Sequence, residues 1–491
     1  MAAGVQHTRD GWRLDETIRG VAIDSRLVKP GYIFVAIPGS TSDGHIFIND
    51  AINRGASAIV GERSLELPVP YFQVNSSRAA AAQLAATFYH FPSRDLTTIG
   101  VTGTNGKTSV VYWLAALVRA GGIRVGMISS VVNDTGDRVR EAILTTPESP
   151  ELQRQLWEMG QNGATHAVVE VSSHGIAQRR VDEIDWNLAV LTNITREHLD
   201  FHGTMENYVA TKAKLFQWLP KDSLGAVLNA DNDYSRVVRE GLVCPVTTYG
   251  LVSGDVKAEI IHATPWYSRV RIDAGGGRVI EGQLNHPGEY NVYNLTAAVT
   301  AALQLGVDAE TIEEAIPTLP GVPGRMQVLQ QPGQPTVIVD YAHTPDGLTQ
   351  SLITVKKMVE GHVWLVFGAR GGRDRGKRPE MGRIAATLAD RVVLTADSPN
   401  EEEPGAIAEA IQEGIYSVNP AKLVKVELDR NRAIHWAVQE ANPSDCILIT
   451  GRGPETYQYF HGRRVILRDA DVVLDALGER ARKGADGIGI H

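Results

Sequence analysis

The 491-residue sequence has few cysteines, no excess of positive charge and no long apolar run. Its two cysteines, Cys244 and Cys446, exclude a disulfide framework or a cysteine-based zinc site, and we expect both in the core of a protein from a reducing compartment. Lysine and arginine total 48 against 57 acidic residues, which excludes a nucleic-acid binder acting through an overall basic field. No run approaches the about 18 apolar residues of a membrane span, and residues 1–9 have no apolar stretch of signal-peptide length. We therefore expect a cytoplasmic protein without nucleic-acid or membrane partners.

The length and a globular composition with 43% hydrophobic residues predict about three domains. Residues 1–91 combine short β-branched runs with helical stretches, typical of a small α/β domain. After Phe91-Pro92-Ser93, strand-like and helical segments alternate, which favours a mostly parallel sheet, and alternation of period two over 255–284 adds a hairpin. Turn residues at 321–324 mark a second break, and five strand-like runs beyond it predict a doubly wound, Rossmann-like domain. We expect domain bounds of 1–91, 92–322 and 323–491.

A glycine-rich loop is the strongest local signal. Gly103-Thr104-Asn105-Gly106-Lys107-Thr108-Ser109 follows an apolar strand-like run and opens an apolar helical stretch. Backbone N–H groups and the helix N-terminus can surround a phosphate there, Lys107 can reach terminal phosphates and Thr108 can bind Mg²⁺. The loop is a short GxxGKT variant, because Val101 stands where the eight-residue pattern has its first glycine. A glycine turn with a solvated lysine is the alternative, but the strand-loop-helix context favours ATP or GTP binding.

Polar side chains at other strand ends are candidates for the same site. Glu170 ends a run that predicts a buried strand, where a carboxylate is costly unless it is paired or binds a metal. His198 follows the next strand-like run, although a lone histidine is more often structural. Lys212 and Lys214 lie on the helical stretch 205–218, and their spacing alone predicts a solvated face for both.

Five motifs in order closely resemble those of the Mur ligases, of the UDP-N-acetylmuramyl-tripeptide synthetase (MurE) type. They are the loop at 103–109, Glu-Val-Ser-Ser-His-Gly at 170–175, Asn193 with His-Leu-Asp-Phe-His-Gly at 198–203, Gly-Val-Pro-Gly-Arg-Met at 321–326 and Asp-Tyr-Ala-His-Thr-Pro-Asp at 340–346. The resemblance extends from Asp24-Ser25-Arg26 to Gly451-Arg452-Gly453-Pro454-Glu455. It implies a UDP-binding N-terminal domain, a central ATPase domain and a C-terminal domain that closes over the site.

The resemblance also implies roles for individual residues. Ile23, Ser25, Ser40, Thr41 and Ser42 would lie near the uridine diphosphate; Thr145, Thr146, Ser172, Gln178 and Arg180 would hold the sugar-peptide; and Asn291, Asn294, Arg325, Asp340 and His343 would contact the nucleotide. The segment 145–148 is also typical of a helix start. In the family a lysine at the position of Lys212 carries a CO₂-derived carbamate, so that Thr108, Glu170, His198 and Lys212 would hold two Mg²⁺ ions.

The implied reaction is an ATP-dependent amide ligation through an acyl phosphate. It adds a third residue, a diamino acid, to UDP-MurNAc-L-Ala-D-Glu in peptidoglycan precursor synthesis. Catalysis would depend on Lys107, Glu170, His198 and Lys212, with the free amino acid as the second partner and a monomer as the expected state.

The expected amino-acid pocket departs from the family pattern. A basic segment at 368–379 is either a solvated loop or, by the resemblance, the carrier of Arg373 at the amino acid's carboxylate. Diaminopimelate-adding members have Asp-Asn-Pro-Arg where this chain has Asp397-Ser398-Pro399-Asn400, and Asn400 cannot supply the arginine's charge, which favours L-lysine. Gly451 and Glu455 remain, the latter to hold an amine, while Pro454 and Gln327 are departures of unknown effect. Arg370 or Arg452 could replace the missing arginine, so diaminopimelate stays open.

Two other functions stay open. The first is another amide ligase of this fold, of folylpolyglutamate or cyanophycin type, against which Asp24-Ser25-Arg26 and Asp43-Gly44-His45 favour a UDP-sugar substrate. The second is a P-loop switch or motor without ligase activity. Such a protein would lack the second α/β domain with its pair of Arg373 and Glu455, and it would hydrolyse nucleotide without an amino acid.

Overall fold

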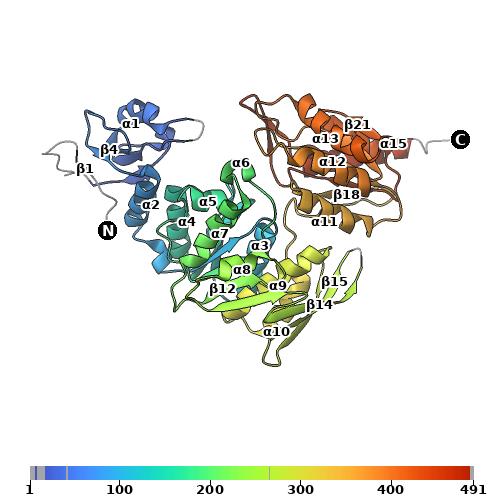
Figure 1. Ribbon diagram of the computed structural model, residues 1–491, viewed down its shortest axis with the longest axis horizontal. Coiled ribbons are helices and arrows are strands. Elements are labelled where there is room, and N and C mark those ends of the chain that lie inside the picture. Colours follow the sequence, from blue (N-terminus) through green and yellow to red (C-terminus); the bar gives the residue numbers. More distant parts are fainter. Residues whose placement is uncertain (1–5, 8–16, 40–41, 265, 487–491) are drawn as a thin grey trace.

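A computed structural model describes residues 6–7, 17–39, 42–264 and 266–486, which form three α/β units, each built around its own sheet (Figure 1). The three-domain α/β prediction is confirmed. Within these ranges, no helix combines the length and the apolar character needed to cross a membrane.

The N-terminal unit contains a five-stranded sheet in the order β1-β5-β4-β3-β2, parallel except for β1. Its elements are β1 (Gln6–His7), β2 (Gly20–Ala22), β3 (Tyr32–Val35), β4 (Ala56–Gly61), β5 (Tyr71–Gln73), α1 (Ile48–Asn53) and α2 (Ser77–Phe88). Successive residues of β3 point to opposite faces, so Phe34 packs in one apolar cluster and Val35 in the other. The hydroxyl of Ser76 accepts a hydrogen bond from the Ala79 N–H and starts α2.

The middle unit contains an eleven-stranded sheet in the order β16-β15-β14-β13-β12-β11-β6-β10-β7-β8-β9. Its parallel strands are β6 (Thr97–Thr102), β7 (Val125–Ile128), β10 (His166–Glu170), β11 (Leu188–Leu191), β12 (Gly225–Asn229), β13 (Val246–Gly250) and β14 (Val256–Ala263). Antiparallel strands extend both edges: β8 (Val132–Asp134) and β9 (Val139–Glu141) at one, β15 (Ser268–Asp273) and β16 (Val279–Leu284) at the other. The predicted hairpin is thus a meander of three strands.

Helices cover both faces of this sheet. One face carries α3 (Lys107–Ala120), α9 (Glu289–Gln304) and α10 (Ala309–Ala315). The other carries α4 (Ser149–Gln161), α5 (Ser173–Ala177), α7 (Met205–Gln217) and α8 (Tyr234–Arg239), with the short α6 (Leu199–His202) just before α7. In β10, Val168 packs with the first set and Val169 with the second. A sheet buried on both faces explains the continuous apolar strands of the sequence.

The C-terminal unit is the predicted doubly wound domain, with the strand order β17-β18-β22-β19-β20-β21. Its strands are β17 (Gln327–Leu329), β18 (Thr336–Val339), β19 (Val363–Phe367), β20 (Arg391–Leu394), β21 (Val424–Val426) and β22 (Cys446–Ile449), and only β17 is antiparallel. Helices α11 (Pro345–Lys356), α12 (Lys377–Leu388) and α13 (Pro404–Val418) cover one face, and α14 (Arg430–Glu440) and α15 (Asp469–Asp486) the other. The hairpin β23 (Tyr457–Phe460) and β24 (Arg463–Ile466) stands apart from the main sheet.

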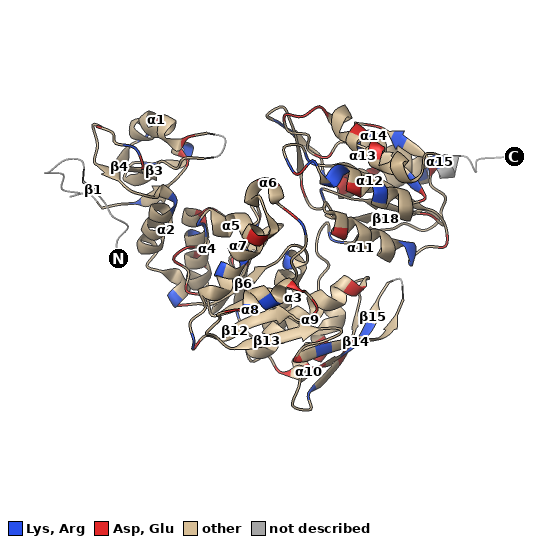
Figure 2. Cartoon of the chain, viewed as in Figure 1, with Lys and Arg blue, Asp and Glu red and all other residues tan. Residues whose placement is uncertain are grey.

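Both cysteines are free and buried, as predicted. Figure 2 shows that acidic and basic residues alternate along the described parts of all three units, and no unit carries residues of one charge alone.

Candidate functional site

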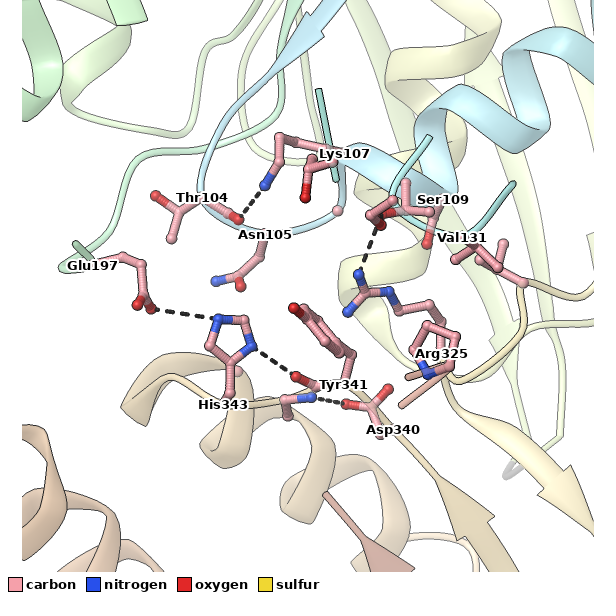
Figure 3. Close-up of a pocket in the computed structure, with 18 of the residues that line it drawn as sticks. Thr104, Asn105, Lys107, Ser109, Val131, Glu197, Arg325, Asp340, Tyr341 and His343 are labelled. Carbon is pink, nitrogen blue, oxygen red and sulfur yellow. Dashed lines mark hydrogen bonds and ion pairs between the residues drawn. The ribbon is translucent and has the colours of Figure 1, made fainter. Parts of the chain in front are cut away.

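A cavity of about 1180 Å³ lies between the middle and C-terminal units. Of the predicted site residues, it is lined by Thr104, Asn105, Gly106, Lys107, Thr108, Ser109, Thr145, Glu170, Ser172, Arg180, His198, Asn291, Asn294, Arg325, Asp340, His343, Arg373, Asp397, Asn400, Gly451 and Glu455. Figure 3 shows the phosphate loop of the middle unit facing Arg325, Tyr341 and His343 of the C-terminal unit.

Other predicted residues do not line the cavity. Gly103 is the first residue of the phosphate loop, and Lys212 bonds to its carbonyl from behind the loop. Thr146, Gln178 and Ser398 form hydrogen bonds to lining residues, while Pro399 is not among the lining residues. Ile23, Ser25 and Ser42 belong to the N-terminal unit, where Ser25 is buried and Ser42 is exposed. Ser40 and Thr41 lie outside the described residues.

The phosphate loop needs both of its glycines. Gly103 and Gly106 have φ values of 147° and 83°, in the region that glycine alone adopts readily. A side chain at Gly103 would collide with Thr192 Oγ1, and one at Gly106 would collide with Asn294 Oδ1. The α3 helix that follows has no side-chain cap, which leaves its first N–H groups available to an anion.

Two charged side chains flank this loop. Lys107 Nζ donates to the Thr104 carbonyl at 2.9 Å, and burial lowers the pKa of Lys107, although Glu170 partly offsets that effect. The carboxylate of Glu170 is 2% exposed, and it accepts hydrogen bonds from Thr108 Oγ1 at 3.1 Å and from the Ser130 N–H at 2.8 Å. An uncapped helix start, a lysine and a hydroxyl beside a carboxylate can together bind a phosphate with a divalent cation.

The predicted solvated face of α7 is wrong at Lys212 and right at Lys214. Lys212 is 1% exposed, its Nζ donates to the Gly103 carbonyl at 2.7 Å, and Nζ lies 4.7 Å from the ring centroid of Tyr208. Burial lowers the pKa of Lys212 well below its ordinary value, and the nearby charge of Lys107 lowers it further. Lys214 is exposed. The signal for the buried face was the pair of aromatics, Tyr208 and Phe216, one helical turn to either side of Lys212.

A group of histidines completes this side of the cavity. His198 has a φ of 56° and its buried Nδ1 has no hydrogen-bond partner, while the ring of His174 lies 4.6 Å away between centroids. Burial lowers the pKa of both rings, that of His174 to about 4. Both are therefore neutral near pH 7, which is the form that binds a metal.

Glu197 and Lys377 are central to the cavity, yet sequence reasoning did not single them out. Glu197 Oε1 lies 3.6 Å from Lys377 Nζ, and Oε2 lies 4.0 Å from His343 Nε2 without a hydrogen bond of its own. Lys377, which begins α12, is 6% exposed and also donates to the His343 carbonyl at 2.9 Å. Both residues lie in charged segments of the sequence, and such segments are ordinarily exposed, so their burial was not predicted.

Further contacts join the two units at the predicted nucleotide end. Arg325 Nη2 donates to Thr108 Oγ1 at 3.2 Å, and its guanidinium stacks 4.0 Å from the Tyr341 ring centroid. Asp340 accepts from the Met326 N–H at 2.7 Å and so fixes the turn that carries Arg325. Asn105 Nδ2 donates to Asp346 Oδ2 at 3.1 Å.

The predicted sugar-peptide residues form one network. Arg180 donates to the Thr146 carbonyl at 3.0 Å and to Gln178 Oε1 at 2.6 Å, and it forms an ion pair with Glu148 at 2.9 Å. Thr146 Oγ1 bonds to both Ser172 Oγ and the Glu170 carbonyl. Neither Thr145 nor Thr146 caps a helix, because α4 begins after Glu148.

Another part of the cavity wall carries the predicted amino-acid residues. Glu455 pairs with Arg370, not with Arg373, through two contacts of 3.1 Å, and Arg373 lies 3.6 Å from Asp200 of the middle unit. Asn400 Nδ2 donates to the Gly371 carbonyl at 2.7 Å. The departures have structural roles: Gln327 Oε1 accepts from the Gly324 N–H, and Pro454 packs against Gly324.

The oxygen and nitrogen ligands beside the phosphate loop fit a cation that is also bound by the nucleotide better than a metal ion held by protein side chains alone. Among the residues described, no cluster of three or more His, Cys, Asp or Glu side chains could hold a metal. Thr108, Glu170 and His198 could supply some ligands beside the loop, with phosphate oxygens as the others.

Comparisons with known proteins agree with this arrangement. The chain matches the profiles described as Mur ligase family, catalytic domain (residues 17–89), Mur ligase middle domain (101–302) and Mur ligase, glutamate ligase domain (324–453). It is 40% identical over 479 residues to a Caldanaerobacter subterraneus protein named UDP-N-acetylmuramoyl-L-alanyl-D-glutamate–2,6-diaminopimelate ligase, covering 97% of this chain and 98% of that protein. The chain belongs to the Mur ligase family.

Other Mur ligases support the assignment. A Geobacillus thermodenitrificans protein of the same name is 41% identical over 470 residues, covering 94% of this chain and 95% of the relative. A solved structure with that name superposes with a TM-score of 0.65 at 31% identity, covering 96% of this chain and 97% of the other. A Thermotoga maritima MurF ligase solved with ADP shares the fold, with a TM-score of 0.67 at 21% identity over 95% of this chain and 98% of that one.

Proposed function

We propose that this chain is an ATP-dependent ligase that adds a diamino acid to UDP-MurNAc-L-Ala-D-Glu, in peptidoglycan precursor synthesis. The observation that carries the proposal is the single cavity that joins a phosphate loop in the middle unit to the Arg370 and Glu455 pair in the C-terminal unit. The relatives named for that reaction, which match nearly the full chain, support it. We also propose a cytoplasmic location, which the two free, buried thiols support.

We propose a separate job for each unit. Residues 1–91 bind the UDP end through Ile23, Ser25 and 40–42. Residues 92–322 bind ATP and, through Thr145, Ser172 and Arg180, the sugar-peptide. Residues 323–491 bind the amino acid and contribute Arg325, Asp340 and His343 to the nucleotide site.

In the first half-reaction, an oxygen of the D-glutamate side-chain carboxylate attacks the γ-phosphorus of ATP. A bond forms between that carboxylate oxygen and the γ-phosphorus, the bond from the γ-phosphorus to the bridging oxygen of ADP breaks, and ADP leaves. Lys107, the α3 N-terminus and Arg325 stabilise the negative charge that collects there. Mg²⁺, when held by Thr108, Glu170 and His198, would supply further neutralisation of the phosphates.

In the second half-reaction, the amine of the incoming amino acid attacks the carbonyl carbon of the acyl phosphate. A carbon-to-nitrogen bond forms, inorganic phosphate leaves, and the amine loses a proton. Arg373 holds the α-carboxylate of the amino acid, and the contacts between the units at Thr108, Asn105 and Glu197 keep water from the acyl phosphate.

We further propose that Lys212 carries a carbamate. Among the described residues Lys212 forms no ion pair, and its lowered pKa favours the neutral amine, which can add CO₂ with loss of a proton. The product is an anion beside Lys107 and the phosphate loop, which gives the cavity a second carboxylate-like group next to Glu170.

Phosphate release tests the proposed function. The purified chain is given ATP, Mg²⁺ and UDP-MurNAc-L-Ala-D-Glu, with and without a panel of amino acids. We expect release that depends on both the UDP-sugar and a diamino acid, with a tripeptide product seen by mass spectrometry. Release without amino-acid dependence contradicts the ligase, and activity with a folate and glutamate instead indicates the folylpolyglutamate type.

A further inference from the structure

Arg370 and Glu455 form a two-pronged ion pair on the wall of the cavity. Arg370 Nη1 and Nη2 lie 3.1 Å from Glu455 Oε1 and Oε2, and the two side chains are 29% and 23% exposed. Both residues line the cavity. The carboxylate that the sequence predicted as free for an amine is therefore already paired with a cation of this chain.

Asp397 adds a second carboxylate to this pair. It is 4% exposed, and no hydrogen bond to its carboxylate occurs in the part of the chain that the structure describes. Its Oδ2 lies so close to Gly451 that a side chain at 451 would come within 2.7 Å of it. Burial alone would lower the pKa of Arg370, but the charges of Glu455 and Asp397 outweigh it and raise that pKa. The group thus holds two carboxylates and one guanidinium, an excess of one negative charge.

The topology explains why these three side chains meet. Arg370 follows β19, Asp397 follows β20 and Glu455 follows β22, and these strands are parallel neighbours in the order β22-β19-β20. Ligands of such sheets collect at the carboxyl ends of the strands. The group is therefore at the binding edge of the C-terminal sheet.

The other side chains near this edge that could bind a carboxylate already have partners within the chain. Arg452 is fully buried, where it and Arg430 both pair with Asp469, so it does not reach the cavity. The Asn400 amide bonds to the Gly371 carbonyl. Arg464 lies over the Tyr457 ring, 3.8 Å from its centroid. Arg370 is the arginine at this edge that faces two carboxylates.

Building on the proposed function, we propose that Arg370 determines which amino acid is added, by binding the second carboxylate of a diamino dicarboxylic acid. The distal ammonium of that acid lies against Asp397 and Glu455. The distal end of such an acid carries a carboxylate and an ammonium, and the cavity wall carries the guanidinium of Arg370 and the carboxylates of Asp397 and Glu455 to pair with them. The lone distal ammonium of lysine would instead lie beside the Arg370 guanidinium and leave it without a new partner, which disfavours lysine. The preference for lysine drawn from Asn400 is thereby reversed.

The test measures kcat/KM for amino-acid-dependent phosphate release with meso-diaminopimelate and with L-lysine. The ratio of the two values within one preparation does not depend on the fraction of folded protein. We expect a ratio of about 30 or more for the unmodified chain. Arg370→Met lowers this ratio at least about tenfold, chiefly through the KM for diaminopimelate. Arg370→Lys lowers it less, because lysine keeps the positive charge but loses the two parallel N–H donors of the guanidinium. Arg375→Met is the matched control, because Arg375 lies on the same loop, is 76% exposed and does not line the cavity.

The outcomes separate this inference from the function on which it rests. Release without amino-acid dependence contradicts the proposed function itself. Amino-acid-dependent release that favours lysine, or a ratio that Arg370→Met leaves unchanged, overturns the role of Arg370 and leaves the ligase standing. If Arg370→Met does not fold, the ratio for Arg370→Lys decides: an unchanged ratio contradicts the inference.

Discussion

Burial holds the pKa of Lys212 well below its ordinary value. Its ammonium would sit against a backbone carbonyl and a tyrosine ring, next to the charge of Lys107, and the charges of Glu197 and Glu170 offset its burial only in part because neither forms an ion pair with it among the described residues. Removing that charge is favourable, because an unpaired buried cation is costly. A carbamate would remove the cation and provide an anion for the phosphate site.

Lys212→Ala is expected to lower ligation about 100-fold or more, because the proposed anion beside the phosphate loop is lost. Formate or acetate should restore part of the activity by occupying the space. Incubation with ¹³C-bicarbonate should give a carbamate signal in the ¹³C NMR spectrum of the unmodified chain and not of Lys212→Ala. Lys214→Ala, on the exposed face of α7, should keep both activity and signal. Full activity of Lys212→Ala contradicts the carbamate.

The sequence predicted a functional role for a single residue where that residue type is unusual in its local segment. Glu170 stood out as a carboxylate at the end of an apolar run, and the structure has it buried beside Thr108. Lys212, Glu197 and Lys377 did not stand out, because a charged residue in a polar segment is ordinarily exposed. Only the fold brings Lys377 and Glu197 together, from positions 180 residues apart in the sequence.

At the scale of elements, the phosphate loop is the part most completely determined by local sequence. The helical stretch predicted to follow the loop is α3. The glycines of the loop start it, and the turn at Gly121 and Gly122 ends it. The edge strands β8, β9 and β17 were not predicted, because each has three residues and too little alternation to detect.

Gly106→Ala is expected to abolish tight ATP binding. The substitution costs about 1 to 2 kcal/mol for a left-handed backbone, and the new methyl group also collides with Asn294. Gly122→Ala is the control, since Gly122 has a φ of 75° but nothing within 4 Å of the added carbon. Calorimetric titration with ATP should therefore give loss of binding for the first variant and near-normal affinity for the second. Equal effects of the two substitutions on binding would attribute the loss to backbone strain alone.

At the scale of the whole molecule, the cavity is formed jointly by the middle unit and the C-terminal unit. Arg325, Asp346 and Lys377 of the C-terminal unit each contact the middle unit at or beside the phosphate loop. Burial raises the pKa of Glu197, and the charge of Lys377 is the largest effect that opposes this. The contact between the units therefore helps to keep Glu197 ionised.

Lys377→Met is expected to lower kcat by about 100-fold while the KM for ATP changes little, because the lysine arrives with the closing unit and not with the nucleotide loop. Lys377→Arg should recover part of the loss. Steady-state phosphate release measures both constants, with Lys357→Met, an exposed lysine on the same unit, as the control. A raised KM for ATP at normal kcat would assign Lys377 to nucleotide binding instead.

The three strand ends that hold Arg370, Asp397 and Glu455 all belong to one sheet, and the phosphate loop belongs to another. The chain passes between these sheets once, through the turn at 321–324. The phosphate loop and the residues that choose the amino acid are thus encoded in separate stretches of the gene, although the last third also supplies Arg325 and Lys377 to the phosphate site. A ligase of this architecture can acquire a new amino acid by mutation at the strand ends that carry 370, 397 and 455, while its phosphate loop is inherited unchanged.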